Sequence, residues 1–195
     1  VTNNLILYNR LKSKNANGVI LGTPGAGKSF AAKQEITNVF LNTDDEILII
    51  DPEGEYSPLA KLFGGEVIKI SSGSKVHINP LDMDMNYADE GDDPVTLKSD
   101  FISSLFETIS RARFGLSPNE VSIIDRCTKN IYKDYVEHMQ TYQGGTCDRK
   151  ASPVLEDLYE ELMKQPDPEA QSLATSLELY AIGSQDIFAK RTNVN

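Results

Sequence analysis

The sequence predicts an α/β fold of the P-loop type followed by an all-α region, and three observations lead to this prediction. Short apolar runs alternate with segments of helical periodicity up to about residue 80. A glycine-rich turn joins the first apolar run to the first helical segment, and the later segments have helical spacing. We therefore divide the chain into an α/β core at 1–80, an acidic loop at 81–93 and a helical subdomain at 94–190.

Three short apolar runs, at 18–21, 46–50 and 66–70, are expected to form the strands of the core. A helix is expected between the first two, at 30–41, because Ala32, Ile36 and Phe40 recur at helical spacing. A short helix is expected around 59–63. This alternation predicts a parallel sheet with right-handed crossovers.

The connection at 81–93 contains acidic residues and no Lys or Arg; the acidic residues are Asp82, Asp84, Asp89, Glu90, Asp92 and Asp93. Such a charge run is typical of an exposed, mobile linker. A divalent-metal loop is the weaker alternative, because the segment lacks the ligand and glycine pattern of an EF-hand.

Pairs of an N-cap residue and a proline mark the expected starts of the later helices. The pairs are Asp93-Pro94, Ser117-Pro118, Ser152-Pro153 and Asp167-Pro168. The first residue supplies an oxygen for the free N–H groups of the helix, and proline suits the first helical position. Glu120 completes a capping box with Ser117. We expect the apolar faces of these helices to pack into a small subdomain.

Composition excludes several classes of protein. The net charge of −10 argues against a surface that grips nucleic-acid phosphates throughout. The longest apolar run has four residues, far too few to cross a membrane. With no metal-ligand spacing, we expect Cys127, Cys147, His77 and His138 to be ordinary structural or surface residues in a reducing, cytoplasmic setting. No signal-peptide pattern is visible at the start of the sequence. Because the chain begins with Val1 rather than Met, we expect further sequence upstream.

The strongest motif, at 22–29, matches G-x-x-x-x-G-K-[ST] and lies between a predicted strand and a predicted helix. Its glycines permit a tight turn in which backbone N–H groups point at a phosphate. We expect the Lys28 ammonium to reach the β- and γ-phosphates of a nucleotide and the Ser29 hydroxyl to bind Mg²⁺. A glycine-rich turn that binds nothing is disfavoured by the complete motif in this context. The predicted nucleotide-binding residues are Gly22, Thr23, Pro24, Gly25, Ala26, Gly27, Lys28, Ser29 and Phe30.

A second group of candidate site residues, Asp51, Glu53 and Glu55, follows the apolar run at 46–50. Parallel α/β sheets bind ligands at the carboxyl ends of their strands. We favour an acidic strand end that flanks the nucleotide without being the Walker B motif. The alternatives are that Asp51 is the Walker B aspartate, holding Mg²⁺ through water, or that the segment is only a turn. Glu53 or Glu55 is a candidate to orient the attacking water or to sense the γ-phosphate.

Two further features have ordinary explanations. Asn79-Pro80 follows an extended stretch at 75–78 and is interpreted as a turn, with a return of the chain to the nucleotide edge as the alternative. Arg111 and Arg113 lie at a predicted helix end, where their charge complements the helix dipole without an arginine finger.

Several segments together resemble the VirB/TraC-type ATPases of type IV secretion and conjugation systems, most closely those of Gram-positive conjugative elements. The segments are 17–30, 49–56, 78–81, 116–120, 177–184 and 192–195. A P-loop alone is common to many NTPases. Its combination with Asp51-Pro52-Glu53-Gly54-Glu55-Tyr56 is more specific, although HerA and FtsK relatives carry looser versions.

The resemblance implies a RecA-like motor domain of the additional-strand class with an all-α insertion. It implies an oligomeric ATPase that uses ATP and Mg²⁺ and works at the inner, cytoplasmic face of a membrane secretion channel, with Lys28 and Ser29 at the phosphates and Mg²⁺. The family's Walker B strand and catalytic glutamate follow the insertion, whereas this sequence has no such strand after Ile78. We therefore expect the first part of a motor domain, with an incomplete sheet, that binds Mg·ATP weakly and hydrolyses it slowly or not at all.

Two alternative functions stay open. A HerA/FtsK-like translocase of double-stranded DNA would show DNA-stimulated turnover and a basic channel loop, and the net charge of −10 speaks mildly against it. A nucleotide-gated interaction module would use binding at Lys28 to position the helical half against a partner, without turnover. The expected partners are further copies of the same ATPase and proteins of the membrane channel, whereas the charge does not indicate DNA.

Overall fold

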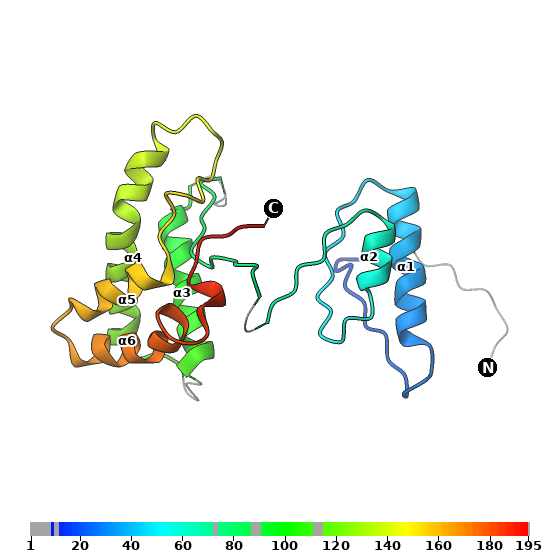
Figure 1. Cartoon of the computed structure of the whole chain (residues 1–195), viewed down its shortest axis with the longest axis horizontal. Coiled ribbons are helices and arrows are strands. Elements are labelled where there is room, and N and C mark those ends of the chain that lie inside the picture. Colours follow the sequence, from blue (N-terminus) through cyan, green and yellow to red (C-terminus); the bar gives the residue numbers. More distant parts are fainter. Residues whose placement is uncertain (1–8, 10–11, 72–73, 87–90, 111–114, 195) are drawn as a thin grey trace. The chain divides into compact units, whose positions relative to one another are not determined.

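The computed structural model of the chain describes residues 9, 12–71, 74–86, 91–110 and 115–194 (Figure 1). Their contacts divide the chain into two units, Val1–Val67 and Ile68–Asn195, which are described separately below. This division groups 68–80 with the helices that follow. Within the described ranges, no helix combines the length and the apolar character needed to span a membrane.

In the described part of the first unit, two α-helices, α1 (Lys28–Asn42) and α2 (Ser57–Leu62), form where the sequence predicts them. They are held together by aromatic side chains. Phe40 of α1 stacks on Phe63, the C-cap residue of α2, with ring centroids 4.1 Å apart and the ring planes at 8°. No residue of either helix is fully buried, so this unit has little hydrophobic core of its own.

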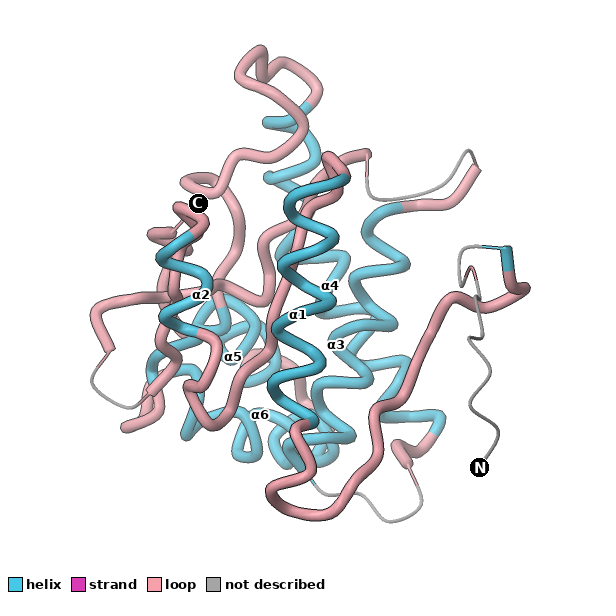
Figure 2. Tube along the Cα trace, turned by 90° about the vertical axis from the view of Figure 1, so that its right-hand side faces the viewer, coloured by secondary structure: helices cyan, strands magenta, loops and turns pink. Residues whose placement is uncertain are grey.

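The strands predicted at 18–21, 46–50 and 66–70 are wrong for the residues that the structure describes. These segments and 75–78 are not assigned as strands, and Figure 2 draws the described parts of the chain only as helices and loops. A strand needs a neighbour to pair with its N–H and C=O groups, and apolar runs find no such neighbour here. Their side chains are accordingly exposed: Val19 by 81%, Leu21 by 87%, Leu48 by 92% and Ile50 by 88%.

Among the described residues, the second unit is a bundle of four helices and one short 3₁₀ helix (Figure 1). The helices are α3 (Pro94–Ser110), α4 (Pro118–Met139), α5 (Leu155–Met163), α6 (Pro168–Ala181) and η2 (Asp186–Phe188). The longest, α4, packs against α3, α5 and α6. The predicted apolar faces meet in one core, whose fully buried members include Ile102, Phe106, Ile124, Tyr132, Leu158, Leu162 and Leu177.

Three of the four predicted helix starts, at Pro94, Pro118 and Pro168, are confirmed. The capping box of α4 is complete: Glu120 N–H donates to Ser117 Oγ at 3.3 Å, and Ser117 N–H donates to the Glu120 carboxylate at 2.7 Å. The start predicted at Pro153 is wrong by two residues. Ser152 is buried and donates its hydroxyl to the Leu81 carbonyl at 3.0 Å, so it is not available as a cap, and α5 begins at Leu155.

The segment that precedes α3 lies partly inside the bundle, so the prediction of an exposed acidic loop is wrong at Leu81 and Met83. Their side chains are 0% and 2% exposed. Side-chain donors hold their carbonyls: Tyr132 donates to Leu81 O, and Tyr135 donates to Met83 O at 2.6 Å. Asp89 and Glu90 lie outside the described residues.

The segment at 192–193 lies beside 75–79, so two distant parts of the sequence meet. His77 N–H donates to Asn193 Oδ1 at 2.8 Å, and Asn193 N–H donates back to His77 O at 3.2 Å. Asn79 N–H donates to Thr192 Oγ1 at 2.8 Å. These bonds fix 75–79 within the second unit.

Candidate functional site

The P-loop motif at 22–29 forms a tight turn that runs directly into α1. Gly25 and Gly27 have φ angles of 78° and 83°, in the left-handed region that glycine adopts without steric cost. Ala26 N–H donates to Thr23 O at 3.1 Å and closes the turn. The backbone therefore has the conformation for which the motif requires glycine.

The start of α1 presents backbone donors. The first bond within the helix runs from Ala31 N–H to Gly27 O at 2.9 Å. The N–H groups of Lys28, Ser29 and Phe30 precede this bond, so no carbonyl of the helix can accept them. The first turn of α1 contains no acidic residue to offset the positive end of the helix dipole. Such a helix start favours an anion.

Lys28 folds back across the loop. Its ammonium donates to the carbonyl oxygens of Gly22 at 2.8 Å and of Thr23 at 3.0 Å. Both acceptors are neutral, and the ion pairs found among the described residues do not include Lys28. Charge-assisted bonds to a phosphate would be stronger than these two bonds.

The carboxylate of Asp51 closes the loop at 51–56. Oδ1 accepts from Gly54 N–H at 2.9 Å and Oδ2 accepts from Tyr56 N–H at 2.8 Å. These bonds, chiefly the one from Tyr56, hold the pKa of Asp51 below its ordinary value of 3.8. Each carboxylate oxygen keeps a second lone pair, so Asp51 can still accept from a water molecule.

The same loop contacts α1 through Tyr56. The Lys33 ammonium lies over the Tyr56 ring, 5.3 Å from its centroid. Glu53 and Glu55 are exposed on this loop. For the residues that the structure describes, no hydrogen bond or ion pair joins either glutamate to the P-loop. The P-loop and the loop at 51–56 are thus connected through α1.

Lys33 and Tyr56 are candidate functional residues that no motif in the sequence marks. Lys33 and Phe40 are seven residues apart and so share one face of α1, and Tyr56 and Phe63 are also seven residues apart. This matched spacing is the signal in the sequence that could have identified the pair.

Comparison with known proteins relates the chain to a family and to a solved structure. Residues 18–180 match the family described as "Helicase HerA, central domain". The chain belongs to this family. The HerA-family chain also matches the solved structure of VirB4 of Thermoanaerobacter pseudethanolicus, with a TM-score of 0.79 and 26% sequence identity. The match covers 97% of this chain and 50% of VirB4. A search of curated proteins gave no match.

These findings confirm the resemblance to VirB/TraC-type ATPases and give the HerA-family chain a fold of the P-loop NTPase type. The chain spans about half the length of the VirB4 that it matches. The comparisons therefore establish membership of the HerA family and similarity to VirB4.

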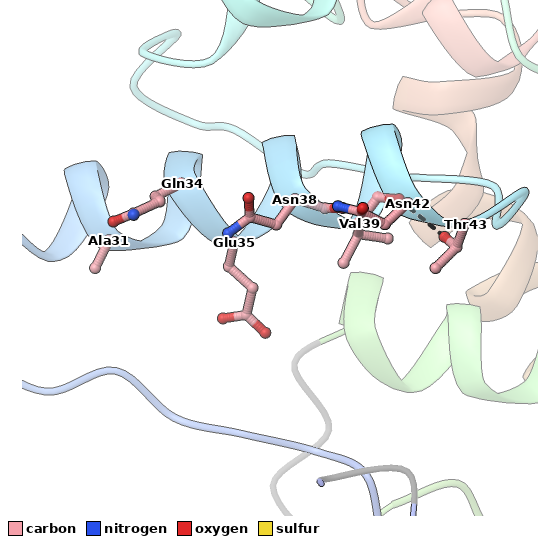
Figure 3. Close-up of a pocket in the computed structure, with 7 residues that line it drawn as sticks. All are labelled: Ala31, Gln34, Glu35, Asn38, Val39, Asn42 and Thr43. Carbon is pink, nitrogen blue, oxygen red and sulfur yellow. Dashed lines mark hydrogen bonds between the residues drawn. The ribbon is translucent and has the colours of Figure 1, made fainter. Parts of the chain in front are cut away.

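A pocket in the HerA-family chain lies along α1 (Figure 3), beyond the P-loop residues. It is lined by Ala31, Gln34, Glu35, Asn38, Val39, Asn42 and Thr43. These residues follow one face of the helix, and Thr43 donates its hydroxyl to Val39 O at 2.9 Å. No residue predicted to bind nucleotide lines this pocket, so the P-loop remains the candidate site.

The remaining sequence candidates have structural surroundings. Cys127 is buried in the bundle, and burial raises the pKa of its thiol to about 11. His138 Nε2 lies 2.9 Å from the Asp148 carboxylate. In the part of the chain that the structure covers, no cluster of three His, Cys, Asp or Glu residues is arranged to hold a metal ion. Arg111 and Arg113 lie outside that part.

Proposed function

We propose that this chain is the nucleotide-binding part of a VirB4-type ATPase that powers conjugative type IV secretion in the intact protein. The observation that carries the proposal is the P-loop at 22–29. It presents three backbone donors of α1 and the Lys28 ammonium at a helix start without an acidic residue. Membership of the HerA family and the match to VirB4 support it.

The residues of the P-loop fit a triphosphate. Lys28 would exchange the carbonyls of Gly22 and Thr23 for β- and γ-phosphate oxygens. The N–H groups of Gly25 and of Gly27 to Phe30 would donate to the phosphates, while the Ala26 N–H closes the turn. The Ser29 hydroxyl would hold Mg²⁺, and the Asp51 carboxylate, which already accepts from Gly54 N–H and Tyr56 N–H, would be the second candidate ligand at the acidic end that flanks the nucleotide. Mg²⁺ neutralises phosphate charge and commonly takes only one or two protein ligands, which fits this donor set.

The exposed carboxylates of the loop at 51–56 complete the proposed site. Glu53 or Glu55 orients the attacking water or senses the γ-phosphate. Since no Walker B strand follows Ile78 in the sequence, we propose that this chain alone binds Mg·ATP with little or no turnover. The exposed runs at 18–21 and 46–50 support pairing with strands from the other half of a VirB4-like protein.

The proposed partners follow from the proposed role in secretion. They are further copies of the same ATPase and proteins of the membrane channel, with the ATPase at the cytoplasmic face of the membrane. VirB4 is the relative that supports this proposal.

Isothermal titration calorimetry with ATP and Mg²⁺ tests the nucleotide-binding role. We expect Lys28→Ala to weaken binding by about 10- to 100-fold, since a hydrogen bond to a charged group contributes about 1.5–3 kcal/mol. Lys61→Ala is the matched control, because Lys61 is an exposed lysine on α2. Equal affinities of the wild type and the Lys28→Ala variant would contradict the proposal.

A second candidate function is translocation of double-stranded DNA, favoured by the match to the HerA family. This function predicts that duplex DNA stimulates phosphate release by the full-length protein. The net charge of −10 on this chain disfavours it.

A further inference from the structure

We propose that Tyr56 is a positioning residue that, through the Lys33 ammonium, fixes the loop at 51–56 on the nucleotide-binding helix and so sets the positions of Glu53 and Glu55. This inference rests on the proposed function, because it assigns a role beside the same P-loop.

Tyr56 is attached on two sides. Its backbone N–H donates to Asp51 Oδ2 at 2.8 Å, which ties the residue to the loop. Its ring lies beneath the Lys33 ammonium at 5.3 Å, which ties it to α1. Tyr56 therefore links the backbone of the loop at 51–56 to α1, the helix that carries Lys28.

The contact lies close to the P-loop along α1. Lys33 is five residues after Lys28, which corresponds to about 7.5 Å along a helix axis. The contact therefore holds the loop at 51–56 on the half of α1 that begins at the P-loop. Anchoring at Phe40, near the other end of α1, would place the loop about 10 Å farther away.

The aromatic contacts hold both ends of α2. Tyr56 is the N-cap residue of α2 and contacts Lys33, while Phe63 is its C-cap residue and stacks on Phe40. Because α2 has no buried residue, we infer that these two contacts, rather than a hydrophobic core, hold α2 against α1. Without the Tyr56 contact, α2 is held only through Phe63, at the end away from the loop at 51–56.

Hydrogen exchange of the Gly54 amide tests the attachment without nucleotide. We expect exchange to be about two- to fivefold faster in Tyr56→Leu and in Lys33→Met, the range that corresponds to an exposed cation–π contact of about 0.5–1 kcal/mol. Tyr56→Phe, which keeps the ring, and Lys61→Met, which removes a lysine elsewhere, should exchange like the wild type. The double variant should be no faster than either single variant. Wild-type exchange in both single variants, or additive effects in the double variant, would overturn the inference.

Steady-state ATP hydrolysis by the full-length protein tests the consequence for the site. We expect Tyr56→Leu to lower kcat at least twofold with unchanged KM, and Tyr56→Phe to restore kcat. Unchanged kcat in Tyr56→Leu would overturn the positioning role. A wild-type protein that does not bind Mg·ATP would instead refute the proposed function, while the exchange experiment would still decide whether Tyr56 holds the loop.

Discussion

Lys28 is a lysine whose ammonium contacts only main-chain acceptors in the described structure, the carbonyls of Gly22 and Thr23. This arrangement occupies two of the three N–H donors of the ammonium and leaves its charge available for an anion. The P-loop turn is thereby supported before a phosphate arrives, which reduces the reorganisation that binding requires.

The hydrogen bonds that Asp51 accepts make the stability of the loop at 51–56 dependent on pH. The pKa of Asp51 lies below 3.8 because the charged carboxylate accepts N–H donors, so its contribution to the loop is present above that pH and is lost as the pH falls through the lowered pKa. We expect the Tyr56 amide resonance to titrate with a midpoint below 3.8 in an NMR pH series. The Asp51→Asn variant should not show this titration. A midpoint above 3.8 would contradict the assignment.

Asn79 is a buried polar residue whose side chain bonds three partners in the second unit. It is 3% exposed, and its amide group donates to Asp82 Oδ1 at 2.9 Å and Pro153 O at 2.8 Å while accepting from Leu81 N–H at 3.0 Å. We expect Asn79→Ala to lower the free energy of unfolding by about 2–4 kcal/mol, since each buried group left unsatisfied costs about 1–3 kcal/mol.

Urea denaturation measures the effect of Asn79→Ala, with Asn130→Ala as the control. Asn130 is exposed on α4 and donates to Glu161 at 2.7 Å, so its loss should cost less than about 0.5 kcal/mol. Equal losses of unfolding free energy for the two substitutions would show that the hydrogen bonds of the Asn79 side chain do not stabilise the second unit.

Individual residues were predictable where the signal is local. The P-loop glycines and the Ser117–Glu120 box depend on neighbours within a few positions, so the sequence identifies them. Leu81 and Met83 were assigned to an exposed loop because the acidic residues around them dominate the composition. Their inward direction depends on α4, which lies far along the chain.

At the scale of the element, the capping box specifies where α4 begins. We expect Ser117→Ala to destabilise the chain by about 1 kcal/mol, because the Glu120 N–H loses its acceptor. Ser122→Ala is the matched control, since the Ser122 hydroxyl only bonds back to Pro118 O within the helix. Thermal unfolding of both variants measures the difference. A loss in Ser122→Ala as large as that in Ser117→Ala would contradict the capping role.

The predicted strands failed for a reason that belongs to the same scale. A helix satisfies its own backbone, whereas a strand depends on a neighbour. The apolar pattern at 46–50 reports a preference for burial, but Leu48 and Ile50 remain exposed in the absence of a paired segment among the described residues. The apolar pattern therefore identifies residues that favour a strand, but it does not show that a sheet forms.

At the scale of the molecule, the two units differ in their hydrophobic core. The core cluster of the described residues runs from Leu81 to Ala181, entirely within the second unit. We expect residues 68–195 produced alone to unfold in a single cooperative transition, and residues 1–67 alone to show none. Circular dichroism with heating measures both. Cooperative unfolding of 1–67 would contradict this account.

The helical composition of the second unit could be predicted from periodicity and capping residues. The attachment of 192–193 to 75–79 could not, because it joins segments more than a hundred residues apart through hydrogen bonds that leave no periodic pattern. The P-loop could be identified from sequence, whereas the contact of Tyr56 with Lys33 depends on how α1 and α2 pack.

Nucleotide binding by the P-loop is tested by a crystal structure of this chain grown with Mg²⁺ and a non-hydrolysable ATP analogue. We expect a triphosphate inside the turn at 22–29, with the Lys28 ammonium moved from the carbonyls of Gly22 and Thr23 to phosphate oxygens. An empty turn in which Lys28 still donates to those two carbonyls would contradict this expectation.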